Sequence, residues 1–401
     1  MDLIGRASNM GILQNHIPQL RFPDFLNDGE WEVKRLGEIA KVVDEKCNIG
    51  KLDIETYIST ENMLQNLEGV KKATKLPDTG SFTRFQKGDI LFSNIRPYLK
   101  KVWQAEFDGA ASNDVIVFRA LSGFDYRFVS QIIKSDSFIA HTMAGAKGVK
   151  MPRGDKNMMM DYLVCIPSLT EQRRIAACLS ALDEMLAATN GKLEQLKAYK
   201  KGLMQKLFPA KGKKLPELRF KEFEKDGVWE EKKLGEITTD IYQPQTISQS
   251  QFSADGYPVY GANGIIGYYE FYNHDTDQIL VTCRGSSCGT INYSVGKCWI
   301  TGNAMVINLD SVQDCYDKRF VYYMLLNKDL SKLITGSGQP QIVRAPLLNL
   351  EVYITNSIYE QRRIAGCFDL IDEMINQYTN KVAVLELYKK GLMQRMFPTS
   401  K

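Results

Sequence analysis

The chain has 401 residues, of which 44% are hydrophobic and 24% are charged, so it is long enough to bury two ordinary cores. It contains no run of about 18 apolar residues, which excludes a membrane-spanning helix, and residues 1–17 lack the features of a secretory signal. The formal net charge of +4 is too small to establish a polyanionic partner. We therefore expect a soluble, two-domain protein that stays in the cytoplasm.

Two copies of a short sequence frame divide the chain. Residues 18–39 contain Pro-x-Leu-Arg-Phe, Asp-Gly-x-Trp-Glu and Leu-Gly-Glu-Ile, and residues 216–237 contain the same three strings in the same order. The segments that follow, residues 40–167 and 238–356, differ from each other. This organisation predicts one repeated scaffold that presents two different surfaces.

The two divergent segments share only a faint skeleton. Short apolar strands are predicted at residues 88–93 and 115–118 of the first segment and at residues 277–282 and 304–307 of the second. Polar, glycine-containing turns follow these strands, and Arg-Phe-Val opens a predicted helix in each segment. Each segment is therefore predicted to be a mixed α and β domain.

Polar residues in both segments are of the kinds that read base edges. Arginine can bond guanine in two places, asparagine or glutamine can bond adenine, and lysine neutralises phosphate. The alternative is that the same residues only form turns. The predicted DNA contacts are Asn94, Arg96, Tyr98, Lys100, Lys101, Asn113, Lys147, Lys150 and Arg153 in the first segment, and Asn263, Arg284, Ser286, Asn303, Gln339, Gln341 and Arg344 in the second.

Each divergent segment is followed by a second repeat, at residues 168–209 and 357–398. Both copies contain Glu-Gln-Arg-Arg-Ile near the start and Tyr-Lys-Lys-Gly-Leu-Met-Gln near the end. A serine three residues before the glutamate is typical of a capping box, and the final proline cannot continue a helix. Each copy is therefore predicted to form one long helix.

Apolar residues in these helices recur every seven positions, which predicts a coiled-coil seam interrupted once per helix by Lys200 and Lys389. The alternative is two amphipathic helices that pack separately on their own domains. The predicted seam consists of Ile175, Leu179, Leu182, Leu186, Leu193, Leu196 and Leu203 in the first helix, and of Ile364, Phe368, Ile371, Ile375, Val382, Leu385 and Leu392 in the second.

Connectivity predicts that the two helices are antiparallel, because the ends of a compact domain usually lie close together. The C-terminal helix should then end beside the first frame, so that the chain is nearly circular with an approximate two-fold axis. A helix of this length is about 57 Å long, which would hold two surfaces roughly one DNA turn apart. The predicted fold class is α+β, with two globular domains separated by the antiparallel helices.

Sequence signatures of catalysis and of metal binding are missing. There is no Asn-Pro-Pro-Tyr or Asp-Pro-Pro-Tyr string for amino-methyl transfer and no phosphate-binding loop for a nucleotide motor. A nuclease-like fragment at residues 23–34 is not retained in its duplicate. The eight cysteines form no Cys-x-x-Cys pair, and the spacing of His274, Cys283, Cys288 and Cys298 matches no common zinc site. We expect no metal site and no cofactor in this chain.

The two doubled signatures closely resemble the specificity subunit of type I restriction-modification systems, over essentially the whole chain after residue 17. This resemblance implies a non-catalytic subunit with two target recognition domains, each of which reads one half of an interrupted, asymmetric sequence in double-stranded DNA. It also implies two modification subunits that use S-adenosylmethionine to methylate adenine, and restriction subunits that use ATP and Mg²⁺. No membrane partner is expected.

The domains predicted on this basis are an N-terminal lead at 1–17, a first target recognition domain at 18–166, a first spacer helix at 167–209, a second target recognition domain at 210–355 and a second spacer helix at 356–401. Two other functions remain open from the sequence. One is a self-sufficient bipartite DNA methyltransferase or nuclease with an unrecognised site, and the other is a coiled-coil adaptor that does not contact DNA.

Overall fold

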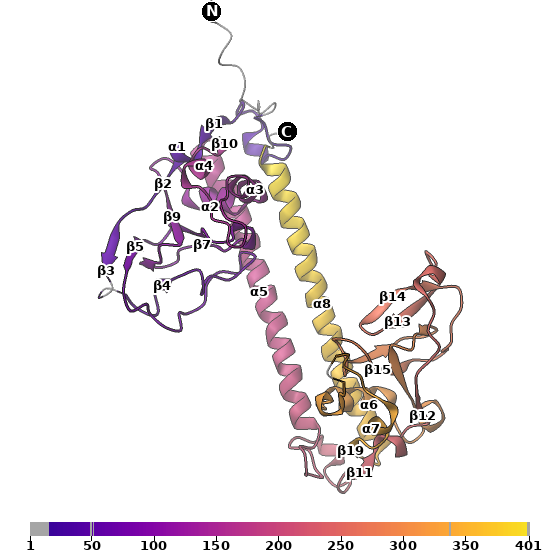
Figure 1. Ribbon diagram of the computed structural model, residues 1–401. Helices are drawn as coiled ribbons and strands as arrows, with labels where there is room; N and C mark the ends of the chain where they lie inside the picture. Colours follow the sequence, from indigo (N-terminus) through magenta and orange to yellow (C-terminus); the bar gives the residue numbers. More distant parts are fainter. Residues whose placement is uncertain (1–15, 49, 51, 337, 399–401) are drawn as a thin grey trace, which may run out of the picture. The chain divides into compact units, whose positions relative to one another are not determined.

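The computed structural model of the protein (Figure 1) describes residues 16–48, 50, 52–336 and 338–398. The chain divides into two compact units, of which unit 1 combines residues up to 189 with residues from 381 onward, and unit 2 contains residues 190–380. Most of the predicted N-terminal lead, residues 1–15, lies outside the described residues. Each unit thus takes a part of both long helices, and the predicted limits of the five domains stay predictions.

Unit 1 contains two four-stranded sheets, in the strand orders β2-β9-β6-β7 and β3-β5-β8-β4, and the antiparallel pair β1-β10. Its longer elements are β1 (Glu32–Arg35), α1 (Leu36–Ile39), β2 (Ala40–Val42), β3 (Lys46–Asn48), β4 (Tyr57–Ile58), β5 (Ser81–Phe85), β6 (Ile90–Ser93), β7 (Val102–Gln104), β8 (Gly109–Ala111), β9 (Val115–Ala120), α2 (Tyr126–Lys134), α3 (Asp136–Ala144), α4 (Lys156–Met160) and β10 (Leu163–Ile166).

Unit 2 repeats part of this topology, with a four-stranded sheet in the order β12-β18-β15-β16, the antiparallel pair β11-β19 and a different small sheet, β14-β13-β17. Its longer elements are β11 (Glu230–Lys233), β12 (Asp240–Tyr242), β13 (Tyr257–Gly261), β14 (Gly264–Tyr269), β15 (Gln278–Thr282), β16 (Ile291–Ser294), β17 (Trp299–Ile300), β18 (Ala304–Asn308), α6 (Lys318–Leu326), α7 (Arg344–Leu348) and β19 (Glu351–Ile354).

The shared skeleton that the sequence predicts is present in both units. The strands predicted from residues 88 and 115 are β6 and β9, and their counterparts β15 and β18 hold the same places in the second sheet. Arg-Phe-Val lies in the first turn of α2 and of α6, where Asp125 and Asp317 cap the helix by accepting backbone N–H bonds. The second small sheet differs between the units, so divergence is concentrated there and in the loops.

The two long helices are α5 (Leu169–Leu207) and α8 (Ile358–Met396), each of 39 residues. The hydroxyl oxygens of Ser168 and Ser357 accept the N–H of the glutamate three residues later, at 3.3 Å in both units. Only this half of the predicted capping box is made among the described residues, because an arginine of the frame holds the glutamate carboxylate instead.

No helix in the described parts of the chain is both long and apolar enough to cross a membrane.

Within each unit the two long helices run antiparallel. In unit 1 the start of α5 and the last turn of α8 contribute to one buried cluster, and further along, Asp183 of α5 binds Lys389 of α8. In unit 2 the Phe208 ring, just after α5, stacks on Phe368 near the start of α8 at 6.0 Å. The lysines that interrupt the predicted seam are therefore not defects, because each pairs with an aspartate of the other helix.

All fourteen predicted seam residues are buried or half-buried. Ile175 and Leu179 belong to the core of unit 1, and Ile364, Phe368 and Ile371 belong to the core of unit 2, so the ends of the seam merge with the globular cores. The ion pairs between α5 and α8 favour paired helices over helices that pack separately. The fully or nearly buried members are Ile175, Leu179, Leu182, Leu193, Leu196, Ile364, Phe368 and Ile371.

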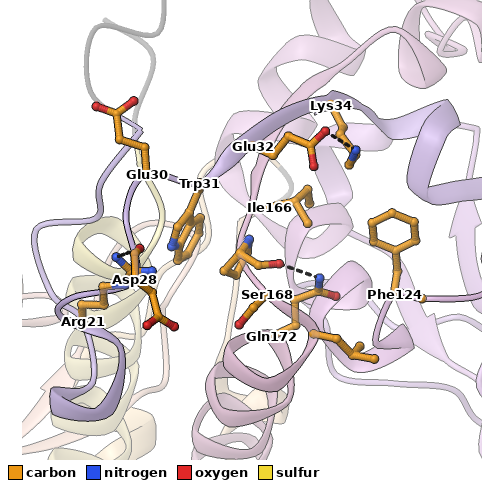
Figure 2. A pocket seen from close by; sticks show the side chains of 13 residues that line it. Arg21, Asp28, Glu30, Trp31, Glu32, Lys34, Phe124, Ile166, Ser168 and Gln172 are labelled. Carbon is orange, nitrogen blue, oxygen red and sulfur yellow. Dashed lines mark hydrogen bonds and ion pairs between the residues drawn. The ribbon is translucent and has the colours of Figure 1, made fainter.

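The frame of each unit is locked to the start of a long helix by a buried ion pair, which we call the clamp. The guanidinium of Arg21 donates to both carboxylate oxygens of Glu171, at 2.8 Å each, and these side chains are only 5% and 1% exposed. Arg21 also donates to the backbone carbonyl of Gly29 and to that of Asp28 (Figure 2). Hydrogen bonding to Glu171 raises the pKa of Arg21, so the guanidinium stays protonated.

Unit 2 contains the same clamp between Arg219 and Glu360, at 2.7 and 2.8 Å. A further contact joins each frame to the last turn of a long helix. The backbone N–H of Leu20 donates to the carbonyl of Arg395 in unit 1, and that of Leu218 donates to the carbonyl of Lys206 in unit 2. In unit 2 the frame binds the end of α5, whereas in unit 1 the equivalent frame binds the end of α8. This arrangement is the one expected for a nearly circular chain.

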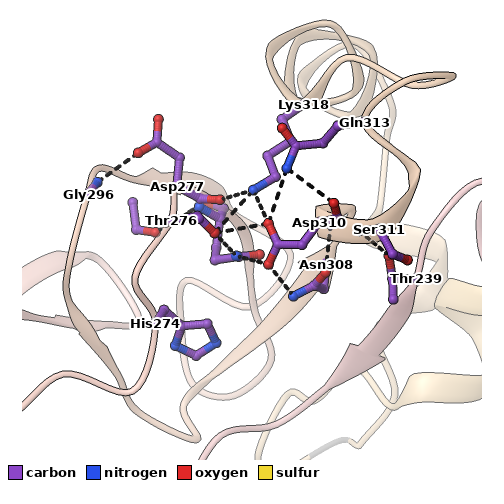
Figure 3. A network of polar contacts seen from close by, with 12 residues as sticks. Thr239, His274, Thr276, Asp277, Gly296, Asn308, Asp310, Ser311, Gln313 and Lys318 are labelled. Atoms are coloured by element: carbon purple, nitrogen blue, oxygen red, sulfur yellow. Dashed lines mark hydrogen bonds and ion pairs between the residues drawn. The ribbon is translucent and has the colours of Figure 1, made fainter.

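Unit 2 also holds a polar network that unit 1 does not repeat in its described part (Figure 3). The buried ammonium of Lys318 binds the Asp310 carboxylate and donates to the carbonyl of Asp277 at 2.7 Å. Thr276 and Gln278 also donate to Asp310, at 2.9 Å each. Burial alone would raise the pKa of Asp310, but these hydrogen bonds outweigh it and lower the pKa from 3.8 to about 2.

We expect the Glu171→Gln substitution to destabilise unit 1 by about 3 kcal/mol, because it leaves the Arg21 charge buried without its counter-ion. Hydrogen exchange of unit 1 amides, with those of unit 2 as the internal reference, measures this loss. Glu55→Gln is the matched control, since the exposed pair of Glu55 with Lys72 should contribute less than about 1 kcal/mol. Equal effects of the two substitutions would contradict the role of the clamp.

We expect the stabilisation of unit 2 by Asp310 to depend on pH. A carboxyl group whose pKa is lowered on folding stabilises the folded state above its ordinary pKa of 3.8, and this contribution is lost as the pH falls toward about 2. Wild type should therefore unfold at a higher temperature than Asp310→Asn at pH 6, and the difference should shrink below pH 3.8. The exposed Asp255, changed to asparagine, is the control. A difference that is constant with pH would disprove the assignment.

Candidate nucleic-acid interface

In unit 1 two loops meet beside the end of β6. The first is residues 94–101, and the second is residues 147–153, in which the backbone groups of Lys147 and Arg153 bond to each other in both directions at 2.9 Å. The N–H of Arg96 donates to the carbonyl of Pro152 at 2.8 Å, and Ile95 forms a bridge with Arg153. The loops therefore form one platform, which holds most of the polar residues predicted for this half of the chain.

The first loop has an unusual backbone. Arg96 and Lys100 adopt left-handed conformations, with φ of 53° and 49°, although neither is glycine. Such conformations cost about 1 kcal/mol or more each and persist only where surrounding contacts impose them. Here they place a short 3-10 turn, Pro97–Leu99, at the surface, with the ring of Tyr98 half exposed.

Two polar atoms of the platform have no partner among the described residues. They are the side-chain oxygen of Asn94 and the Nε of Arg96, both buried. The N–H of Asn94 donates to the carbonyl of Asp114 at 2.8 Å. Buried polar groups without partners are rare in proteins and are usually satisfied by water or by a ligand. Both residues are otherwise half-buried, so Asn94 and Arg96 stay predicted contacts.

Other predicted contacts of unit 1 are engaged within the protein. Lys100 forms an ion pair with Asp136, and Lys101 donates to the carbonyl of Thr60 at 2.6 Å. Burial lowers the pKa of Lys101, and the nearby Lys71 adds to this effect. The remaining members, Asn113, Lys147, Lys150 and Arg153, are exposed. Asn113 accepts a bond from Lys46, Lys147 pairs with Asp155 at 3.5 Å and Arg153 pairs with Asp114 at 3.0 Å.

Unit 2 builds a platform on the same backbone contacts. Thr335 and Gln341 bond to each other in both directions, as Lys147 and Arg153 do, and the N–H of Gly285 donates to the carbonyl of Pro340. Gly148 and Gly336 follow the first residue of each closing pair, with φ of 97° and 89°. The backbone of the platform is thus shared, whereas the side chains that it presents are not.

Some of the residues predicted for unit 2 line a pocket of about 470 Å³ at this platform. Arg284, Gln341 and Arg344 line it. Arg344 is held there by the carboxylate of Asp240 at 2.6 Å, and this hydrogen bond lowers the pKa of Asp240. Ser286, Asn303 and Gln339 are exposed on nearby turns, and Asn263 lies apart in the turn between β13 and β14.

A second pocket, of about 430 Å³, lies next to the clamp in unit 1 (Figure 2). Trp31, Ser168 and Gln172 line it. The side-chain oxygen of Gln172 accepts the N–H of Asp125, so Gln172 ties the start of α5 to the start of α2. This pocket is a junction of scaffold elements and is not part of the polar platform.

The part of the chain that the structure describes contains no group of three or more histidine, cysteine, aspartate or glutamate residues arranged to hold a metal ion. His274 and Cys298, considered from the sequence, do lie opposite each other in a β-bridge. Both ring nitrogens of His274 are engaged, however, at 2.7 Å from Asn273 and 2.8 Å from Tyr242. Burial lowers the pKa of His274, so its ring is neutral.

Sequence reasoning missed the carboxylates that hold the predicted arginines and the apolar residues at the tip of the second loop. Asp114 and Asp240 are far in sequence from Arg153 and Arg344, and only the folded chain brings them together. Val149 and Met151 are exposed between predicted cations. An apolar residue among lysines in a polar stretch is a signal that the sequence does contain.

Comparison with protein families gives two matches. The model described as the type I restriction modification DNA specificity domain matches residues 28–198 and again residues 227–386. Together the two matches cover most of the chain, and each begins inside a frame and ends inside a long helix.

Comparison with individual proteins agrees. The chain is 26% identical to the type I restriction enzyme MjaVIII specificity subunit of Methanocaldococcus jannaschii, over 93% of this chain and 92% of that protein. It is 30% identical to the EcoprrI specificity subunit of Escherichia coli, over 40% of each chain. Among solved structures, the S subunit of a type I restriction-modification system from M. genitalium superposes with a TM-score of 0.70, at 18% identity, over 96% of this chain and 99% of that one, which shows a shared fold.

Proposed function

The chain belongs to the type I restriction-modification specificity family, whose members recognise DNA and are not the catalytic subunits. We propose that its two units recognise different halves of one asymmetric DNA target. The observation that carries this proposal is the pair of platforms. Their backbone contacts are the same in both units, whereas their side chains differ at almost every exposed position. Two different recognition surfaces on a repeated scaffold suit a DNA target with two different halves.

The charges of the two platforms support DNA as the ligand. Unit 1 presents Lys147, Lys150 and Arg153 beside the unpaired polar atoms of Asn94 and Arg96. Cations contribute affinity through phosphates, and the amide and guanidinium groups discriminate base edges. Unit 2 presents more amides and fewer cations, so its half of the target should depend more on base contacts.

Exchange of residues 40–167 for the equivalent segment of another family member should change only one half of the recognised sequence. Mapping of methylated adenines in cells that carry the hybrid measures this result. The reciprocal exchange of residues 238–356 is the control and should change only the other half. A change in both halves, or in neither, from the first exchange would refute the division of labour between the units.

The chain works in a complex with other subunits, and we propose that two copies of a modification subunit dock on equivalent patches of the long helices. One row of the seven-residue repeat, next to the seam, is identical in α5 and α8. It consists of Cys178, Met185, Lys192 and Tyr199 in α5, and of Cys367, Met374, Lys381 and Tyr388 in α8. Identity at solvent-facing positions is not required for packing, so it indicates a shared contact.

From the register of the two helices we infer that each unit presents one methionine and one tyrosine of this row close together. In unit 1 the ion pair of Asp183 with Lys389 sets the register. This register predicts that Met185 of α5 lies near Tyr388 of α8, and these side chains are 50% and 59% exposed. In unit 2 the pair of Lys200 with Asp372 does the same for Tyr199 and Met374, which are 60% and 41% exposed. Tyrosine and methionine are enriched in protein interfaces, and two identical patches suit two identical partners.

The double substitution Met185→Lys and Tyr388→Lys should remove one modification subunit from the complex, because lysine is depleted in the core of interfaces. Adding Met374→Lys and Tyr199→Lys should remove the second. The mass of the purified complex, measured by light scattering, counts the bound subunits. Val384→Lys is the matched control, since Val384 is exposed on α8 but is replaced by glutamine in α5. An unchanged mass for the fourfold variant would disprove the docking site.

We also propose that the chemistry resides in the partners. S-adenosylmethionine would bind the modification subunits, and ATP and Mg²⁺ the restriction subunits, with the complex in the cytoplasm. The support is the sequence, which contains neither the Asn-Pro-Pro-Tyr or Asp-Pro-Pro-Tyr string of amino-group methyltransferases nor a phosphate-binding loop.

A further inference from the structure

The second loop of the unit 1 platform is a rigid hairpin with an apolar tip. The backbone bonds between Lys147 and Arg153 close its base, and the bond from Arg96 to Pro152 fixes it to the first loop. The next residue, Gly154, is buried so tightly that an added side chain would come within 2.3 Å of Met159. The base of the hairpin therefore has little freedom to move.

The tip of the hairpin is exposed to solvent. Val149 is fully exposed and Met151 is half exposed, at 104% and 50% of their reference areas. Lys147 and Lys150, on either side of Val149, are also exposed. A branched apolar side chain held away from any core, between two cations, contributes nothing to folding. Its position suits contact with a polyanion that also offers apolar groups.

We propose that Val149 reads the C5-methyl group of a thymine in the half-site bound by unit 1, while Lys147 and Lys150 contact the flanking phosphates. This inference rests on the function proposed above. The major groove of DNA is wide enough for a two-stranded ribbon, whereas the minor groove is about half as wide. In the major groove the thymine methyl is the one apolar group that distinguishes a base, and aliphatic side chains recognise it by direct contact.

The equivalent hairpin of unit 2 supports a role in discrimination. It has the same closing bonds, but in sequence Ser337, Gly338 and Gln339 stand at the positions of Val149, Lys150 and Met151. Serine lacks the aliphatic group that contacts a thymine methyl, and glutamine suits adenine. The two hairpins thus share their closing backbone bonds and carry groups that match different base edges.

The test uses the full chain, with its co-purified subunits, and synthetic duplexes of the target found by methylation mapping. Each thymine of the unit 1 half-site, assigned by the segment exchange, is replaced in turn by deoxyuridine, which lacks only the methyl group. Wild type should lose about fourfold in affinity at one position, as expected for one buried methyl group. Val149→Ala should bind the thymine duplex more weakly and show no further loss with deoxyuridine.

Two matched variants complete the test. Val149→Ile keeps a branched apolar side chain and should keep the sensitivity to deoxyuridine. Val295→Ala removes an exposed valine in unit 2 and should behave as wild type on the unit 1 half-site. Because Val149 is fully exposed, unchanged thermal unfolding is expected for its variants.

The possible results separate this inference from the proposed function. Specific binding without loss at any thymine, a unit 1 half-site without thymine, or full deoxyuridine sensitivity in Val149→Ala would overturn the role of Val149 and leave the proposed function intact. Absence of sequence-specific binding altogether would overturn the proposed function itself. Loss at one thymine in wild type, and its disappearance in Val149→Ala, would establish the contact.

Discussion

The buried ion pair between a frame arginine and the glutamate at the start of a long helix is the constraint on which the rest of the structure depends. Arg21 and Glu171 in unit 1, and Arg219 and Glu360 in unit 2, are almost inaccessible to water. Removal of either partner would strand a charge in a low-dielectric interior, which is far more costly than the loss of an exposed pair. This asymmetry explains why the two strings that supply the partners both occur twice, although they lie about 140 residues or more apart.

The clamp also determines how the chain is divided. It fixes each frame to the start of the helix that leaves the same unit, while the backbone bond from Leu20 or Leu218 fixes the frame to the end of the other helix. A unit is therefore complete only when it holds one helix start and one helix end. In unit 1 the helix end comes from the C-terminal part of the chain. The compact units cut across the long helices for this reason.

Sequence patterns predicted the scaffold well because its constraints are periodic or punctuated. Ser168 and Pro209 bracket α5 to within two residues, and the seven-residue spacing identified side chains that are all at least half-buried. The pairing of Lys200 with Asp372 was missed, since a charged seam residue does not disclose its partner. The platforms were harder still. Their common feature is a set of backbone bonds, which residues as different as Lys147 and Thr335 make equally well, so only a glycine and a proline of each hairpin remain alike in the sequence.

Backbone bonding is what allows the two platforms to diverge without loss of the fold. The closing bonds of each hairpin use N–H and C=O groups, which every residue except proline supplies, and a glycine provides a left-handed position in each. The exposed tip residues contribute little to stability, so their replacement is nearly neutral for folding. Buried charges, helix ends and the seam have no such freedom. The fold thus confines sequence variation to the surface that meets the ligand, and a new specificity can arise there while the clamp and the helices stay the same.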